Sequence, residues 1–128
     1  MKLKTIIKKM PDGSQGFAVI SVAPQRITFD ETCNKASKGS TFSRHELKAA
    51  VEILAETIAE DMRRGNIVDL GPLGIFQPTA KSGMKPNADD FTWHDVKANV
   101  CFRPAKGLKQ SAEQGVKRWM KGRKQQGQ

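Results

Sequence analysis

The sequence predicts an α+β fold in which a β-hairpin, a pair of helices and a second β-region follow one another. Three observations support this prediction. Turn-forming residues 11–16 separate two short β-prone segments, a capped amphipathic helix starts at Ser43, and the hydrophobic pattern changes from helical to strand-like at Ile67. At 128 residues, the chain is about one domain long.

The N-terminal segment is predicted to form a β-hairpin. Residues 2–9 and 17–23 are rich in β-formers, and residues 11–16 (PDGSQG) between them favour a turn. Pro24 is expected to end the second strand, because proline has no N–H for the strand ladder.

Two helices with recognisable start signals are predicted next. Residues 28–31 (TFDE) have the form of a capping box and open a short helix that ends near Lys38. Residues 43–46 (SRHE) are a second capping box, and the long helix behind them ends at residues 65–66 (GN). Its apolar residues recur at spacings of three and four and form one stripe: Leu47, Ala50, Val51, Leu54, Ile58 and Met62. We expect this stripe to form the centre of an intertwined homodimer, because it is too long for one small monomer to cover.

The second half of the chain is predicted to be β-rich and to end in a helix. Gly71 and Gly74 allow the backbone to bend sharply between two strand segments. Gly107 and Gly115 are expected to interrupt the final helix. In order, the predicted elements are a strand at 67–70, a bend at 71–74, a strand at 75–77, a polar loop at 78–90, a β-rich segment at 91–102 and a basic helix at 105–121.

Positive charge is concentrated at the two ends of the chain. The formal net charge is +9, yet residues 27–102 carry nine basic and eleven acidic side chains. Residues 1–26 carry five basic and one acidic side chain, and residues 103–128 carry eight basic and one acidic. This asymmetry favours a polyanionic partner, either nucleic acid or an anionic membrane surface, over a merely solubilising charge excess.

Nothing in the sequence predicts export or membrane insertion. Residues 1–10 contain only a three-residue apolar patch, which is too short for a signal-peptide core. No apolar run approaches the about 18 residues that span a bilayer. Cys33 and Cys101 lie far apart, as expected for reduced thiols. We therefore expect a cytoplasmic protein.

Catalysis and metal binding are not expected. No pair among His45, His94, Cys33 and Cys101 has the spacing of a zinc site, so structural roles are favoured for all four. The sequence also lacks a nucleophile elbow, a phosphate-binding P-loop and a paired-carboxylate setting. We expect no enzyme, no cofactor and no small-molecule substrate.

Two stretches resemble the bacterial HU and integration-host-factor family of histone-like DNA-binding proteins. Residues 65–76 (GNIVDLGPLGIF) are similar to that family's G-x-x-V-x-L-x-G-F-G-T-F segment, with Leu73 and Ile75 in place of the usual aromatic residue and threonine. Residues 100–109 (VCFRPAKGLK) are similar to V-x-F-K-P-G-K-x-L-K, with Ala105 where glycine is common. The leading hairpin is similar to that of an HU-related branch with an N-terminal extension.

The resemblance implies an intertwined dimer with a helical base, a β-sheet and two β-arms. It divides the chain into a hairpin extension (1–25), an HU-like domain (26–121) and a basic tail (122–128) that we expect to be disordered. The implied partner is double-stranded DNA, bound in the nucleoid by a homodimer or by a heterodimer with a paralogue. The DNA-binding residues would be Lys81, Met84, Lys85, Pro86, Lys97, Arg103, Lys106 and Lys109.

The start of the last helix is suited to phosphate contact. Arg103, Lys106 and Lys109 recur at three-residue spacing, and long cations on one surface bind duplex DNA by releasing counterions. Pro104 is expected to begin the helix and to leave its first amides free for phosphate. For Trp93, packing in the core or on the dimer surface is expected rather than stacking on a base.

The turn of the predicted arm has two alternative positions. Residues 83–87 (GMKPN) resemble the family's G-R-N-P-Q tip, where a proline wedges into a base step and bends the duplex. A symmetric hairpin from Phe76 to Phe102 would instead turn near residues 89–90 (DD), which would face phosphates unfavourably. The arm is therefore either irregular with Pro86 near its tip, or shorter and less able to bend DNA.

Three functions are compatible with these patterns. The first is an architectural DNA-binding protein with little sequence preference. The second is an HU-fold dimer that binds protein through its N-terminal hairpin, and the third is an RNA-binding module. The basic residues 103–128 favour the first and third functions, whereas the acidic arm turn and the added hairpin favour the second.

Overall fold

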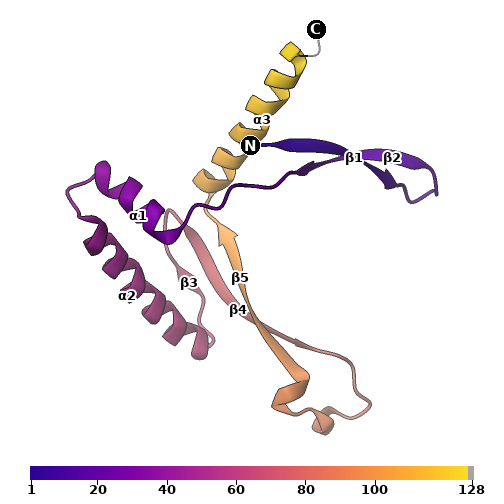
Figure 1. Ribbon diagram of the computed structural model, residues 1–128. Helices are drawn as coiled ribbons and strands as arrows, with labels where there is room; N and C mark the ends of the chain where they lie inside the picture. The colour runs from indigo at the N-terminus through magenta and orange to yellow at the C-terminus, as the bar shows by residue number, and fades with distance from the viewer. Residues whose placement is uncertain (127–128) are drawn as a thin grey trace. The chain divides into compact units, whose positions relative to one another are not determined.

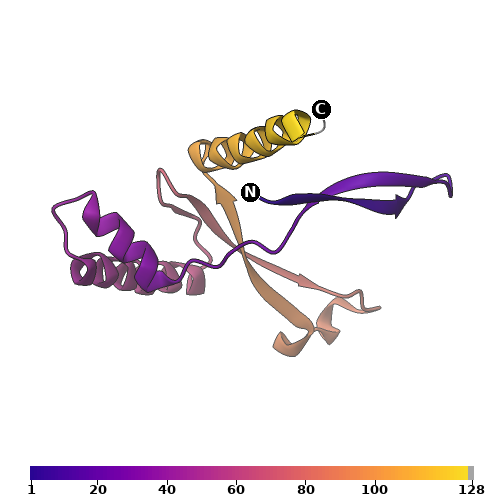
Figure 2. The same ribbon diagram turned by 45° about the horizontal axis from the view of Figure 1, so that its top comes forward.

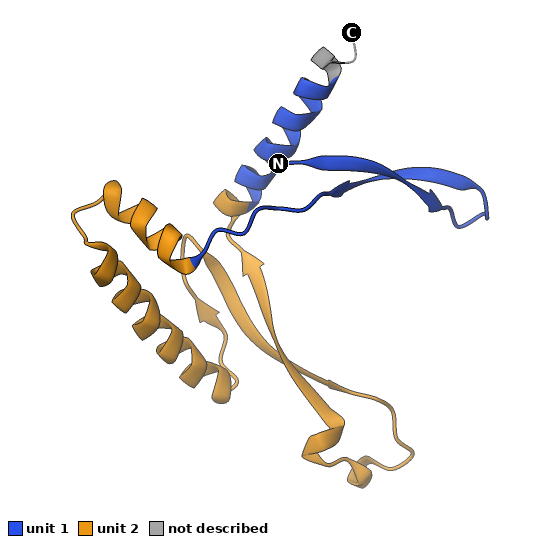
Figure 3. Cartoon of the chain, in the orientation of Figure 1, with its two compact units in different colours: residues 1–28, 109–128 blue, residues 29–108 orange. Residues whose placement is uncertain are grey.

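The computed structural model describes the backbone of residues 1–126 and the side chains of residues 1–123. Within this part, three helices and two small antiparallel sheets form the mixed α+β fold that the sequence predicts (Figure 1). The chain divides into two compact units (Figure 3). One consists of Met1–Thr28 and Lys109–Gln128, and the other of Phe29–Leu108, so that the boundary falls inside the last helix.

The predicted N-terminal hairpin is present. Strands β1 (Leu3–Lys9) and β2 (Gln15–Ser21) pair antiparallel, and the second strand ends two residues earlier than predicted. In the turn, an oxygen of the Asp12 carboxylate accepts from the amide of Ser14 at 2.9 Å and from its hydroxyl at 2.6 Å. These bonds lower the pKa of Asp12. Gly13 supplies the left-handed conformation, with φ of +90°.

Helices α1 (Phe29–Lys38) and α2 (Arg44–Arg63) lie side by side (Figures 1 and 2). Their bounds agree with the predicted ones. The side chain of Ser43 caps α2 by accepting from the amide of Glu46 at 3.1 Å, which satisfies one of the donors left free at a helix start. The N-cap of the long helix is thus confirmed.

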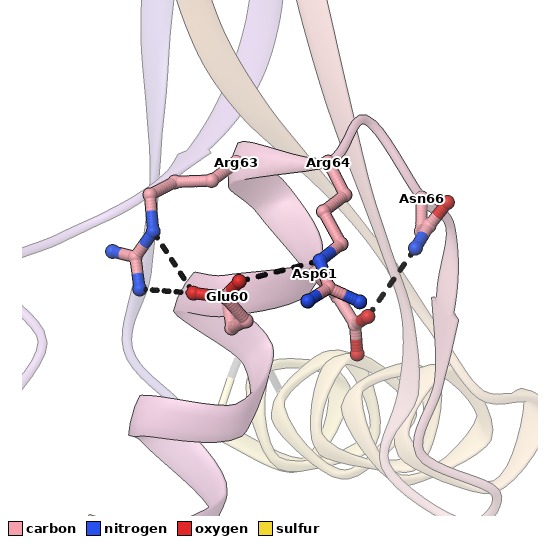
Figure 4. A network of polar contacts seen from close by, with 5 residues as sticks. All are labelled: Glu60, Asp61, Arg63, Arg64 and Asn66. Atoms are coloured by element: carbon pink, nitrogen blue, oxygen red, sulfur yellow. Dashed lines mark hydrogen bonds and ion pairs between the residues drawn. The ribbon is translucent and has the colours of Figure 1, made fainter.

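Side-chain contacts connect the end of α2 to the chain that follows it (Figure 4). The Glu60 carboxylate accepts from Arg63 Nη2 at 2.6 Å and lies 3.2 Å from Arg64 Nε. The amide of Asn66 donates to the Asp61 carboxylate at 3.3 Å. Such exposed pairs each contribute little, about 0.5 kcal/mol.

Strands β3 (Val68–Asp69), β4 (Gly74–Ser82) and β5 (Val96–Pro104) form an antiparallel sheet in that order. β4 and β5 are paired along their whole lengths and extend beyond β3 as a two-stranded ribbon, which we call the arm (Figure 1). The prediction of a loop from residue 78 was therefore wrong, since β4 continues through Pro78.

The position of Pro78 in a strand has a simple explanation. The carbonyl of Gly74 accepts from the Leu70 amide, so it points toward β3. Backbone groups alternate along a strand, which places the Pro78 nitrogen on the same edge of β4. β3 pairs with β4 only at residues 75 and 76, so that edge is already unpaired at Pro78 and no ladder bond is lost.

The glycine-rich bend between β3 and β4 is a fold element, as predicted. Gly71 has φ of +55° and Gly74 has φ of +143°, conformations that other residues rarely adopt. A Cβ on Gly74 would lie 2.3 Å from the Arg103 carbonyl oxygen and 2.8 Å from the Phe102 ring. Glycine at this position therefore lets β5 approach the bend.

Helix α3 (Lys106–Gln126) is longer and more regular than predicted. It continues through Gly107 and Gly115, and past the expected end at residue 121. Residues 122–126 of the predicted disordered tail are therefore helical, whereas residues 127–128 lie outside the described residues. Pro104 does not begin this helix, because it is the last residue of β5.

A single chain has almost no core. Among the described side chains, only Cys33, on the α1 face toward α2, is buried, with 4% of its surface exposed. The predicted apolar stripe on α2 is only partly covered, since Val51 and Leu54 at its middle are 46% and 45% exposed. An ion pair between Lys48 and Asp30 at 2.7 Å joins the two helices, and this contact lowers the pKa of Asp30.

Candidate nucleic-acid interface

The arm has one apolar and one polar face. Side chains alternate along each strand, and the register pairs Phe76 with Phe102, so facing residues lie on the same side. The rings of this pair are 4.8 Å apart between centroids. The apolar face consists of Phe76, Pro78, Ala80, Val96, Ala98, Val100 and Phe102, with Ser82 at its end, and the polar face of Gln77, Thr79, Lys81, Lys97, Asn99, Cys101 and Arg103, with Ile75 beside Arg103.

Three of the predicted DNA-binding residues lie on the polar face. Lys81 and Lys97 are direct partners across the strands, next to the loop that closes the arm. Two like charges in this position destabilise a strand pair unless an anion lies near them. Farther along the same face, Arg103 Nη2 donates to Gln77 Oε1 at 3.0 Å, which fixes the guanidinium across the ribbon.

The loop at the end of the arm is irregular. Residues 83–95, which we call the tip loop, include two single-turn 3-10 helices, η1 (Ala88–Asp90) and η2 (Trp93–Asp95). The register from Phe76–Phe102 to Ser82–Val96 is centred on residue 89, as in the symmetric alternative, but Pro86 lies in the same irregular loop as η1, so both predicted alternatives stay open. Pro86 is exposed, and Met84 is fully exposed at 101%.

Lys85, another predicted DNA-binding residue, makes contacts inside the tip loop. Its amine donates to the Asp95 carboxylate at 2.7 Å and to the Asp90 carbonyl oxygen at 3.1 Å, and it lies 5.7 Å from the centre of the Phe91 ring. The same Asp95 oxygen also accepts from the amide and the hydroxyl of Thr92, at 2.8 and 3.0 Å. Asp95 and Lys85 thus connect both sides of the loop.

Substituting Asp95 by asparagine is expected to loosen the tip loop. Asparagine keeps the shape of the side chain but loses the charge that attracts Lys85, and charge-assisted hydrogen bonds are the stronger ones. Amide exchange at Thr92 should therefore become several-fold faster. Asp89→Asn removes the same charge from η1 and serves as the control. Equal exchange rates in the two variants would contradict a holding role for Asp95.

The contact between Lys85 and Asp95 is expected to respond to pH only in strong acid. The hydrogen bond from Lys85, followed by those from Thr92, lowers the pKa of Asp95 below its ordinary value of 3.8. A depressed carboxyl pKa stabilises the structure above the ordinary value, and this contribution is lost as the pH falls through the lowered one. Exchange at the Thr92 amide, corrected for its intrinsic pH dependence, should stay constant from neutral pH down to about pH 5. Loosening between pH 7 and 5 would contradict this assignment.

The remaining predicted site residues lie on α3. Lys106 and Lys109 are three residues apart in the helix and so share one side of it. The predicted residues therefore fall in three places: Lys81, Lys97 and Arg103 on the polar face of the arm, Met84, Lys85 and Pro86 in the tip loop, and Lys106 and Lys109 on α3.

Sequence reasoning missed the structure around Trp93. The prediction that Trp93 packs in the core of the chain was wrong, because Trp93 is 81% exposed. Its packing on a dimer surface stays a prediction. Thr92 and Asp95 form a capping box around η2. Its signal is present in the sequence as Thr92-Trp93-His94-Asp95, an aspartate version of the pattern used to predict the starts of α1 and α2.

The described part of the chain contains no group of three His, Cys, Asp or Glu side chains placed to hold a metal ion. The His94 ring instead stacks on Trp93, with 3.8 Å between centroids. Cys33 is buried and Cys101 exposed, both as free thiols.

No helix in the described part of the chain has the length and hydropathy to cross a bilayer.

Comparison with known proteins points to one family. Residues 1–118 match the model of the HU-HIG family, described as an HU domain fused to a wHTH, Ig or glycine-rich motif. The hairpin thus lies within the matched region. No curated protein matches the chain. A crystal structure of a candidate bacterial DNA-binding protein from Bacteroides vulgatus is similar in fold, with a TM-score of 0.64 at 16% identity. The similarity covers 88% of this chain but only 45% of that one.

Proposed function

Because the chain belongs to the HU-HIG family, we propose that it is a histone-like architectural protein that binds duplex DNA with little sequence preference. The observation that carries this proposal is the polar face of the arm. Lys81 and Lys97 face each other there without a carboxylate between them in the strand register, and Arg103 lies on the same side. A phosphate backbone would relieve the repulsion between the two lysines.

Low sequence preference follows from the kind of side chains available. Lysine and arginine contacts to phosphate position a protein on DNA but carry no base information. On the polar face, Gln77 and Asn99 have groups that read base edges, and Gln77 is already bonded to Arg103. Binding would therefore depend mainly on charge and on the deformability of the duplex, as expected for a nucleoid protein.

We infer that the active form is a dimer. The single chain exposes 11198 Å², whereas a compact monomer of the same mass exposes about 6,700 Å². The difference includes the α2 stripe and the apolar face of the arm, where Val100 and Phe102 are 49% and 44% exposed. A second copy of the chain, or a paralogue, would cover these surfaces.

Competition between nucleic acids tests the proposal. A labelled duplex is bound at fixed salt and then displaced by unlabelled duplex of unrelated sequence, by single strands or by structured RNA. We expect the unrelated duplex to compete as well as an unlabelled copy of the first duplex. Both should compete better than single strands or structured RNA. Preferential displacement by RNA would replace the proposal with an RNA-binding function.

Bending depends on which residues of the tip loop meet the duplex. A proline wedge partly unstacks one base step, at a cost of a few kcal/mol that a longer contact surface offsets. If Pro86 is this wedge, Pro86→Ala should reduce the bend and weaken binding, and less so on nicked DNA, where the step is already unstacked. Energy transfer between dyes at the ends of a short duplex measures the bend.

The alternative for the same loop gives the opposite result. If the acidic residues of η1 face the DNA, Pro86→Ala should leave the bend unchanged. Replacing Asp89 and Asp90 together by asparagine should then tighten binding, because it removes repulsion from phosphates. If the Asp89→Asn/Asp90→Asn variant binds no tighter and Pro86→Ala reduces the bend, Pro86 is the wedge.

A second function is favoured by the N-terminal hairpin. Ile7 and Phe17 face each other across β1 and β2 and are 66% and 79% exposed, with Val19 on the same face. An exposed apolar face of this kind marks a binding surface for protein more often than for DNA. Deleting residues 1–25 should spare DNA binding if the hairpin serves only this second function.

A further inference from the structure

Trp93 has an unusual setting for a tryptophan. At 81%, it is the most exposed aromatic side chain among the described residues. By contrast, Phe91, two residues away in the tip loop, is 37% exposed and lies under the Lys85 amine. The exposed indole therefore presents a large ring with a polar N–H to a partner, and it does not pack within the chain.

The indole is held in place although it is exposed. Trp93 is the first residue of η2, which the Thr92–Asp95 capping box closes at both ends. Lys85 bonds to the same Asp95 carboxylate from the other side of the loop. His94 stacks on the indole at 3.8 Å, with 33° between the ring planes. An aromatic ring that is fixed before binding loses less conformational entropy when it meets a partner.

The cations at the base of the tip loop favour a nucleic acid over a protein partner, while Asp89 and Asp90 add two negative charges within the loop itself. Lys81 and Lys97 form the strand pair next to the last one, Ser82–Val96, from which the tip loop begins. The nearest carboxylate in the sequence, Asp95, is neutralised by Lys85. An exposed aromatic ring in a loop whose supporting strands carry cations is suited to stacking on a base while the cations contact the backbone.

We propose that Trp93 is the base-stacking residue of the arm, with the His94 ring stacked against the indole. This inference rests on the proposed DNA-binding function and adds a residue to it. The indole stacks on a base at a step that the arm has opened, and Lys81 and Lys97 contact the flanking phosphates. Because opening a step costs energy, the contact is strongest at a nick or gap.

Tryptophan fluorescence tests the proposal on the full chain. Trp119→Phe leaves Trp93 as the only tryptophan. In the free protein, its emission should be readily quenched by acrylamide. On binding a gapped duplex, the emission should fall, because stacked bases quench the indole, and acrylamide should lose access. Binding itself is followed separately by the anisotropy of a dye on the DNA.

Substitutions give a second readout. Trp93→Ala should weaken binding to gapped DNA about tenfold, the loss expected for one base–aromatic stack. Trp93→Phe should restore most of the affinity, because phenylalanine also has a ring face. Phe17→Ala, which removes an aromatic ring of similar exposure from the hairpin, should leave the affinity unchanged. Unaltered thermal unfolding of Trp93→Ala would show that the loss is not due to misfolding.

The outcomes separate this inference from the function on which it rests. If DNA is bound with full affinity while Trp93 stays open to acrylamide, the stacking role is wrong and the DNA-binding function stands. If Trp93 is shielded already in the free protein, it packs on a protein surface and the inference is overturned. If the labelled DNA is not bound at all, both the inference and the proposed function fail.

Discussion

Substituting Leu54 by aspartate is expected to abolish both the dimer and the fold. Leu54 lies at the middle of the apolar stripe on α2 and is 45% exposed in the single chain. In the proposed dimer it would be buried, and a buried, unpaired carboxylate destabilises a protein by about 4 kcal/mol or more. Small domains have a total stability of about 5–15 kcal/mol. Sedimentation and circular dichroism should therefore detect an unfolded monomer.

A neighbouring residue provides the control for this experiment. Ile53 is more exposed, at 64%, and projects from the side of α2 that carries Glu60. Ile53→Asp places the same charge one residue away and should leave a folded dimer. A folded, soluble Leu54→Asp dimer would mean that the stripe does not form the dimer centre.

Replacing Arg103, Lys106 and Lys109 together by alanine should flatten the salt dependence of DNA binding. Each phosphate that is neutralised contributes about −0.9 to the slope of log affinity against log salt. The loss of three cations should therefore reduce the steepness by about two to three units. The slope is measured by anisotropy of a labelled duplex over a series of salt concentrations.

The control has to remove the same charge elsewhere. Replacing Lys35, Lys38 and Arg44, on α1 and at the start of α2, lowers the net charge by the same three units. We expect this variant to keep the slope, because these side chains would not contact phosphates. If both variants flatten the slope equally, binding follows the overall charge and not a defined surface. An unchanged slope in the first variant would place the DNA surface elsewhere.

The helices and the hairpin turn were predictable because their signals are local. The Ser43 cap and the apolar spacing of α2 lie within one segment, as do the turn residues around Asp12 and Gly13. The two family motifs were also sufficient to identify an HU-related protein, as the match of residues 1–118 to the HU-HIG model confirms. Local chemistry thus determined the type of most elements.

The arm was less predictable because it depends on pairing between distant residues. Pro78 is a strand breaker in isolation, and only the shortness of β3 makes its edge free. Likewise, Lys85 is an ordinary surface cation in the sequence, while its partner Asp95 is ten residues away. The η2 cap around Trp93 was also not predicted, because the strand pattern gave a β-rich segment over residues 91–102.

The central claim, that two copies of the chain bind one duplex, is tested most directly by sedimentation of a dye-labelled duplex with the wild-type protein at low salt. The dye is followed, so only DNA and its complexes are observed. We expect the duplex to sediment with the added mass of two chains, and two unrelated sequences of equal length to give the same result. A duplex that sediments alone at saturating protein, or that carries a single chain, would contradict the account.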